Sequence, residues 1–243
     1  MATLLSIIQD ACKELGLPSP SAVAASTDET VITLLAMANR EGRAIARDHD
    51  WTVLTKPATI TTIASTAEYA LEDDYSRLLR QTEWDNTGLR PMVGPVNEQE
   101  WRALKVSAVG SGVVGRRFRI ARGSTGITRK VWIDPTPTSV DTLTYQYTSK
   151  YWCANAAGTP KEGWTVDTDV PIVDPDGDLH RLGIQVRFRR SKGLDFASEA
   201  DEYLDLFKTL VAQDRPSPVL NMAPSPGAAL LSLNNVPETG YGS

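Results

Sequence analysis

The stretch RAIARDHDWTVLTKPATITT, residues 43–62, marks the point where the apolar spacing of the sequence changes from helical to extended. Up to Arg47 the apolar residues recur with a helical period, whereas from Trp51 onward the residues that favour strands alternate. The polar residues in between, from Asp48 to Asp50, compete for nearby backbone groups and so favour the end of a helix. The stretch therefore predicts a helix that runs into a strand.

Two helices are predicted before this junction. Residues 4–15 place their apolar side chains on one helical stripe, and Gly16 ends it. A second stripe covers residues 31–45, and residues 26–29 match a capping box in which Ser26 is the cap. Two helices joined by a short connector cannot bury both stripes between themselves, so the sequence calls for further helices.

Short alternating segments separated by turn sequences follow the junction. Residues 117–121 and 130–133 flank the glycine-bearing turn 123–126 and predict a β-hairpin. A short helix is expected at residues 97–103, with Asn97 as its cap. Strands this short, with turns at close intervals, predict antiparallel sheets in a small sandwich or barrel.

Helical periodicity returns towards the end of the chain. The segment DPDGD, residues 174–178, predicts a helix start with Asp176 or Asp178 as the cap, and the stripe in residues 196–211 predicts one more helix. From Pro216 onward the sequence is rich in Pro, Ser, Gly and Asn. Such a composition cannot bury enough apolar surface to fold alone.

These elements predict an α+β fold with three parts. Residues 1–50 together with 174–215 are expected to form a helical bundle, because neither end of the chain can bury its apolar stripes alone. Residues 51–173 form an inserted antiparallel β domain, in which residues 154–169 are an exposed loop anchored by Trp164. Residues 216–243 form an extended C-terminal arm.

The composition limits the class of protein. Of the 243 residues only Cys12 and Cys153 are cysteines, and we interpret both as buried apolar residues of a protein from a reducing cytoplasm. The sequence shows no signal segment and no apolar run long enough to span a membrane, so a soluble protein is expected. The net charge of -5 argues against a protein whose main task is to bind nucleic acid, but it allows weak contact with DNA.

Three patterns are compatible with chemistry, and each has a plainer interpretation. The segment GSGVVG, residues 110–115, matches a dinucleotide fingerprint but leads into a strand, so a flexible loop is preferred. The aspartates of residues 174–178 lack the spacing and the final glutamate of a calcium loop, and helix capping explains them. His49 could be the base of a hydrolase, but a polar junction residue is the preferred interpretation. We therefore expect no enzyme activity, catalytic residue, metal or cofactor.

Charged residues gather in two places. One basic cluster lies on the predicted hairpin and another on the helix after residue 178, which an acidic stretch follows. Opposed charges on adjacent helices suit neighbouring copies that pair side by side, a helix pair within one chain, or a solvated surface. The candidates for a subunit interface or a lumen are Arg187, Arg190, Lys192, Glu199, Glu202, Arg117 and Arg119.

Several motifs resemble those of a known family. The segment YALEDDYSR, residues 69–77, is similar to that family's Y-x-L-P-x-D-x-x-R, with Glu72 in place of the usual proline. The segment WIDPTP, residues 132–137, with the tyrosine-bearing strand after it, resembles the family's strand and P-x-P turn, and Asp50 with Trp51 resembles its helix-to-strand junction. On these motifs residues 1–215 resemble the head-to-tail adaptors of short-tailed bacteriophages, also called tail tubular protein A or tail accessory factor.

That resemblance implies a structural protein of the virion. The family forms a ring, typically dodecameric, between the portal protein and the downstream tail (nozzle) protein, and DNA passes through its lumen during ejection. The resemblance implies a homo-oligomer whose contact with DNA in the lumen is transient and non-specific. It implies no contact with a membrane, and assembly of the virion in the host cytoplasm.

The same resemblance gives the predicted arm a role, because the C-terminal segment of the family commonly reaches into the portal. An extended chain rises about 3.1 Å per residue, so this arm could span tens of ångströms. The candidate portal contacts are Pro216, Pro218, Val219, Leu220, Met222, Leu230, Leu231 and Leu233.

An alternative to the adaptor is a tail-associated β-domain module that binds a glycan or a tail fibre. Exposed aromatic side chains favour such recognition, because each presents a large rigid face together with a polar handle. Trp84, Trp152 and Trp164 are the candidates in this sequence.

Overall fold

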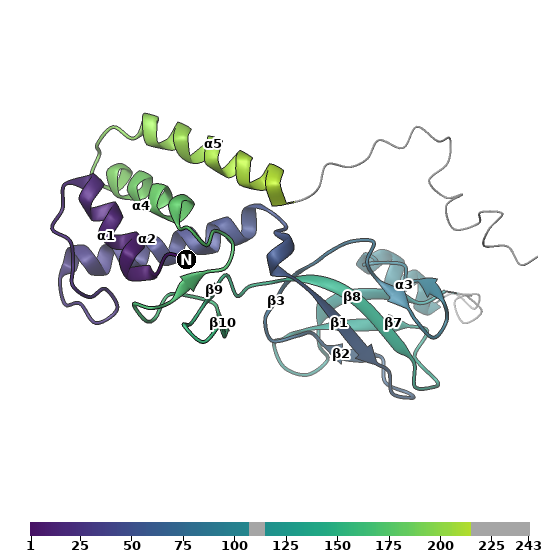
Figure 1. Ribbon diagram of the computed structural model, residues 1–243. Coiled ribbons are helices and arrows are strands. Elements are labelled where there is room, and N and C mark those ends of the chain that lie inside the picture. Colours follow the sequence, from purple (N-terminus) through teal and green to yellow (C-terminus); the bar gives the residue numbers. More distant parts are fainter. Residues whose placement is uncertain (107–114, 215–243) are drawn as a thin grey trace, which may run out of the picture.

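The computed structural model describes residues 1–106 and 115–214 of the chain. These residues form a helical body and a β body that lie next to each other and are joined near the predicted junction (Figure 1). The predicted arm, with its candidate portal contacts, and most of the GSGVVG segment lie outside the described residues.

The helical body consists of four helices from the two ends of the chain. They are α1 (Leu4–Leu15), α2 (Glu29–Asp48), α4 (Asp178–Ser191) and α5 (Ala197–Asp214). Both ends contribute to one apolar core, whose buried residues include Leu4, Ile7, Ile8, Ala11, Leu34, Ile45, Leu179 and Ile184. α5 covers this core with half-buried side chains, which include Tyr203, Leu206, Phe207, Leu210 and Val211. The stripes that the first two helices could not bury are therefore covered by helices from the other end of the chain.

The start of α2 differs from our prediction by two residues. Asp28 is the cap, and its carboxylate accepts a hydrogen bond from the backbone N–H of Thr30 at 2.8 Å. Ser26 instead accepts from the backbone N–H of Asp28, at 3.2 Å. Serine and aspartate both cap well, and the position of the first helical turn decides which of them reaches a free N–H group.

The start of α4 also differs from our prediction. Asp174, rather than Asp176 or Asp178, accepts a hydrogen bond from a free amide of the first turn, that of Leu179, at 2.7 Å. Gly177 is the cap residue and has φ 79°, a left-handed conformation that glycine adopts at little cost. The turn at Gly177 brings the chain back on itself, so the earlier aspartate faces the helix end.

The predicted change from helix to strand is confirmed, but the strand begins later than Trp51. A single 3₁₀ turn, η1 (Thr52–Leu54), separates α2 from strand β1 (Thr55–Thr61). Trp51 is buried, and its indole nitrogen donates to the carbonyl oxygen of Ile45 at 2.7 Å. This bond fixes the direction in which the chain leaves α2.

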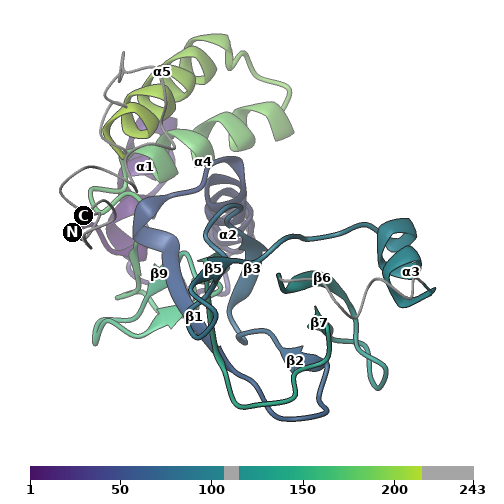
Figure 2. The same cartoon turned by 90° about the vertical axis from the view of Figure 1, so that its right-hand side faces the viewer.

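The β body holds two antiparallel sheets and one helix. One sheet has the order β1–β8–β4–β5, with β3 also paired to β8, and the other has the order β2–β7–β6. The remaining bounds are β2 (Glu68–Ala70), β3 (Tyr75–Leu78), β4 (Trp84–Asp85), β5 (Arg90–Pro91), α3 (Glu98–Val106), β6 (Arg117–Arg122), β7 (Arg129–Asp134) and β8 (Thr142–Ser149). α3 lies beside β6 and β7, on the side of the β body that faces away from the helical body (Figures 1 and 2).

The β body has its own apolar core. Its buried residues are Ala58, Ile60, Tyr69, Met92, Phe118, Val131, Ile133, Leu143, Tyr145 and Tyr147. The predicted hairpin is confirmed by the pairing of β6 with β7, and Asn97 caps α3 as predicted, accepting from the backbone N–H of Glu100 at 2.8 Å. Helices together with antiparallel sheets confirm the α+β class.

A third small sheet packs against the helical body. It consists of β9 (Cys153–Ala154), β10 (Pro160–Lys161) and β11 (Val170–Pro171), in the order β10–β9–β11. Trp152, just before β9, and Trp164, between β10 and β11, are only 1% and 4% exposed and belong to the helical core. Their proposed role as exposed recognition residues was therefore wrong. Trp152 lies against Gly42 of α2, where an added Cβ would come within 2.2 Å of the indole ring.

Candidate functional site

The junction between the two bodies is held by residues of the YALEDDYSR segment. Arg77 of β3 donates to the carboxylate of Asp50 and to the carbonyl oxygens of His49 and Arg47, the last at 2.9 Å. These acceptors lie at and just after the end of α2, where carbonyl groups lack helical partners. Arg77 thus fastens the β body to the end of α2.

Asp74 of the same segment is the centre of a buried polar cluster. Lys56, Tyr147 and Ser149 each donate a side-chain hydrogen bond to its carboxylate, at 2.6, 2.6 and 2.7 Å. Burial alone would raise the pKa of Asp74, but these hydrogen bonds outweigh burial and hold that pKa below its usual value. The cluster joins β1 to β8 and to the turn before β3.

The end of α5 fastens the junction from the other side. The carboxylate of Asp214 accepts hydrogen bonds from the backbone N–H and the hydroxyl of Thr52, and one of its oxygens lies 3.2 Å from Nε2 of His49. The ring of His49 also meets Trp51 edge to face at 4.8 Å. Periodicity cannot reveal this contact, since Asp214 and Thr52 are far apart in sequence.

The arrangement around His49 does not follow the order of a nucleophile, a base and an orienting acid. In that order a hydroxyl donates to the histidine and the histidine to the carboxylate. Here the hydroxyl of Thr52 donates to Asp214 directly. This geometry favours a structural role for His49.

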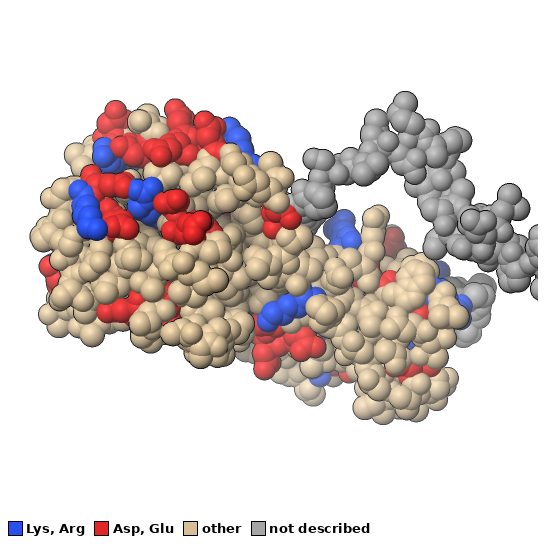
Figure 3. All heavy atoms as spheres, viewed as in Figure 1, with Lys and Arg blue, Asp and Glu red and all other residues tan. Residues whose placement is uncertain are grey.

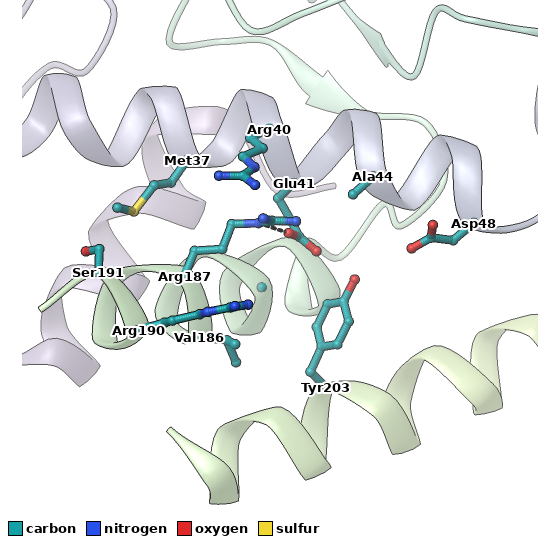
Figure 4. A pocket seen from close by; sticks show the side chains of 11 residues that line it. Met37, Arg40, Glu41, Ala44, Asp48, Val186, Arg187, Arg190, Ser191 and Tyr203 are labelled. Atoms are coloured by element: carbon teal, nitrogen blue, oxygen red, sulfur yellow. Dashed lines mark hydrogen bonds and ion pairs between the residues drawn. The ribbon is translucent and has the colours of Figure 1, made fainter. Parts of the chain in front are cut away.

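An open groove of about 600 Å³ lies between α2, α4 and α5 (Figure 4). At the bottom of the groove Arg187 forms an ion pair with Glu41, which is only 2% exposed. Burial, followed by the negative charge of Glu41, raises the pKa of Tyr203, so this phenol stays neutral. Gly183 makes room for the pair, because a Cβ there would come within 2.4 Å of the Glu41 side chain.

Two further arginines flank this groove. Arg40 of α2 and Arg190 of α4 are exposed and point into it (Figure 4). Within residues 1–106 and 115–214 neither has an ion-pair partner or an aromatic ring beneath its guanidinium. The groove is lined by three arginines against the two carboxylates of Glu41 and Asp48, so within the described residues its lining keeps one excess positive charge.

Several of the predicted interface residues have partners within the chain. Arg187 pairs with Glu41, and Glu199 pairs with Arg189 at 3.0 Å. Arg119 pairs with Glu98 and lies over the rings of Trp101 and Trp132.

The other predicted interface residues are split between the two bodies. Lys192 lies over the ring of Phe188, with Nζ 5.6 Å from the ring centre. Arg117 lies on β6 of the β body, apart from Arg190 and Glu202 on the helical body. The predicted residues therefore do not form one surface.

The described residues contain no group of three or more His, Cys, Asp or Glu that could hold a metal ion. His180 is buried among Trp152 and Trp164, away from His49. Both cysteines are free and buried, and burial, with Asp169 nearby, raises the pKa of Cys153 to about 12. That thiol is therefore a poor nucleophile. No helix among these residues is long and apolar enough to cross a membrane.

Comparison with known families gives one match that covers nearly the whole chain. The family model described as SU10 adaptor protein matches residues 2–225. The match thus includes both bodies and the junction between them. No curated protein matches the sequence.

Proposed function

Because this chain belongs to the SU10 adaptor protein family, we propose that it is the structural head-to-tail adaptor of a bacteriophage virion, acting without catalysis. Membership makes it a phage adaptor and a component of the virion. The proposal adds that its copies form a dodecameric ring between the portal protein and the tail. The observation that carries it is the family match over residues 2–225.

The architecture supports this proposal. Four helices from both chain ends share one core, and the β body is attached to it through paired strands and the bonds of Arg77. A helical body of this kind offers long, regular faces to neighbouring copies, while the β body stays free for other tail components. The net charge of -5 suits a conduit that does not hold DNA tightly.

In this proposal residues 216–243 attach the ring to the portal protein, and the other side of the ring meets the tail. Each short segment that orders on a partner binds weakly, because ordering costs entropy. Several linked segments in one ring raise the overall avidity without new kinds of contact.

Electron microscopy of the purified protein, alone and mixed with its portal protein, tests the proposal. We expect closed rings with a central opening that stack coaxially on portal rings. Particles that stay monomeric in both samples would contradict it.

One observation supports a second proposal, in which the β body is a tail-associated module that binds a glycan or a tail fibre. Of the three tryptophans considered for it, only Trp84 is exposed, at 41%. If Trp84 binds such a partner, Trp84→Ala removes binding in a glycan array or a tail-fibre pull-down while rings still form.

A further inference from the structure

We propose that the groove between α2, α4 and α5 of one copy receives the acidic edge formed by Asp178, Glu202 and Asp205 of the next copy. The inference rests on the proposed ring and names the two faces that meet in it. Each copy then offers one positive and one negative face.

The groove is suited to an acidic partner. Arg40 and Arg190 flank it without an ion pair inside the described part of the chain, whereas Arg187 is already occupied by Glu41. An exposed guanidinium presents several donors to a carboxylate and can form two parallel hydrogen bonds. The groove is also open, and the charges that line it sum to one positive, from Arg40, Arg187 and Arg190 against Glu41 and Asp48, which favours an acidic side chain as its occupant.

The acidic edge lies on another side of the α4–α5 pair. There a second depression, of about 570 Å³, is lined by Asp178, Arg181, Leu182, Glu202, Asp205, Leu206 and Thr209. Glu202 is exposed and has no ion pair within the residues that the structure places, and Asp205 pairs only with the exposed Lys208, at 3.1 Å. Figure 3 shows acidic side chains gathered along the top of the helical body, where α5 lies in Figure 1.

Negative charge is concentrated around the start of α4. Burial, and after it the charges of Asp174, Asp176 and Asp10, raise the pKa of Asp178. Arg181 forms ion pairs with both Asp178 and Glu14, so its single positive charge is divided between two carboxylates. An arginine from a neighbouring copy would relieve this crowding.

The two faces are arranged for growth in one direction. Arg190 and Gly183 of α4 line the groove, whereas Asp178 and Leu182 of the same helix line the acidic edge. A two-fold dimer needs one self-complementary patch, but here the complementary patches are different surfaces of one chain. Such a contact is heterologous, and it yields a closed ring when the rotation between copies closes.

Charge reversal of each face tests the proposal in the full-length protein. One variant carries Arg40→Glu with Arg190→Glu, and the other carries Glu202→Lys with Asp205→Lys. In either variant on its own, the groove of one copy and the acidic edge of the next carry charges of the same sign. We therefore expect the protein concentration at which half of the chains are assembled to rise by about tenfold or more. Assembly is measured by analytical ultracentrifugation and electron microscopy, with and without portal protein.

Mixing the two variants is the decisive measurement. In an alternating ring every contact again joins opposite charges, so an equimolar mixture regains assembly that neither variant shows alone. Recovery also proves that both variants are folded. Arg80→Glu in the β body, at an exposed arginine that like Arg40 and Arg190 has no ion pair within the described residues, is the matched control and leaves assembly unchanged.

Other outcomes separate this inference from the proposed function. If the wild type forms rings and both reversed variants form them equally well, the inference fails and the ring stands. If the wild type forms no ring even with portal protein, the proposed function fails. If the arginine variant assembles normally but loses salt-dependent binding to a duplex DNA oligonucleotide, the groove contacts DNA phosphates and the inference is overturned.

Discussion

Asp214 of α5 holds Thr52 with both carboxylate oxygens, each 3.1 Å from the Thr52 backbone nitrogen. The same carboxylate also accepts the Thr52 hydroxyl and contacts His49. Three neighbouring polar groups at the junction thus depend on one side chain from the far end of the described chain. This arrangement makes Asp214 the first residue at which to test how the junction is held.

We expect Asp214→Ala to lower the free energy of unfolding by about 1–3 kcal/mol, because it leaves the Thr52 amide without its partner. Asp214→Asn loses less, since its amide oxygen still accepts one hydrogen bond. Chemical denaturation measures both. Asp201→Ala, on the exposed face of the same helix, is the control and is close to neutral. Equal losses for the two alanine variants would contradict the assignment.

The Asp74 cluster predicts a pH dependence of stability. A carboxyl group whose pKa is lower in the folded state contributes stability above its unfolded pKa, about 3.9. That contribution is lost as the pH falls from this value through the folded pKa of Asp74, which is lowered. We expect Asp74→Asn to be less stable at neutral pH and to lose less stability on acidification. Urea unfolding from pH 7 to pH 2 measures this, with Asp73→Asn as the exposed neighbouring control.

Helix propensity and packing have opposite effects on stability in the substitution Gly42→Ala. Alanine is the better helix former by about 1 kcal/mol, so Gly42→Ala in an exposed helix would stabilise the protein. Here the new Cβ would lie 2.2 Å from the ring of Trp152, and overpacking of this kind costs about 1–3 kcal/mol. We expect a net loss in thermal denaturation. Gly115→Ala, where nothing lies within 4 Å of the new Cβ, is the control; a more stable Gly42→Ala variant would show that Trp152 moves freely.

Two arginines of α4 that line the groove, Arg187 and Arg190, are expected to contribute unequally to stability. Arg187→Met leaves the buried Glu41 without its cation and is expected to cost about 2–3 kcal/mol, less than for a fully buried pair because Arg187 is partly exposed. Arg190→Met removes a cation without a partner in the described chain and is expected to leave the unfolding free energy of the monomer nearly unchanged. Adding Glu41→Leu to Arg187→Met recovers part of the loss. Similar costs for the two single variants would contradict this reading.

Deletion of residues 216–243 tests their proposed role in attachment. The two apolar cores and the side chains packed against them lie within residues 2–211, so we expect the melting temperature to stay within a few degrees of the full chain, about the shift that 1 kcal/mol produces. Co-sedimentation with purified portal protein is expected to be lost. Undiminished co-sedimentation would rule out this segment as the anchor.

Local patterns predicted most elements but not how they meet. The change of period at Trp51, the stripes of the helices and the β6–β7 hairpin are properties of neighbouring residues, and they were right to within a few positions. The caps of α2 and α4 were wrong because Ser26, Asp28 and Asp174 all have suitable side chains, and tertiary geometry chooses among them.

Contacts between distant segments could not be predicted. Trp152 and Trp164 lie in a turn-rich stretch of low apolar content, yet α2 and α4 bury both. Similarly, Glu41 appears as an ordinary charged residue of a helix until Arg187 and Gly183 close over it. In each case a contact between α2 and a segment more than a hundred positions away contributes to the burial, and no local pattern contains it.

The pairing of Thr55 with Thr148 has a mechanical consequence. β1 leaves the helical body and β8 returns to it as antiparallel neighbours, and β8 also pairs with β3 and β4. A force that pulls the two bodies apart therefore acts on the start of β1 and the end of β8 in the same direction. Such a force does not separate the two strands from each other. Because β1 and β8 lie side by side, they resist a stretching force between the two bodies together. A rotation of one body relative to the other about the axis of these two strands meets less resistance.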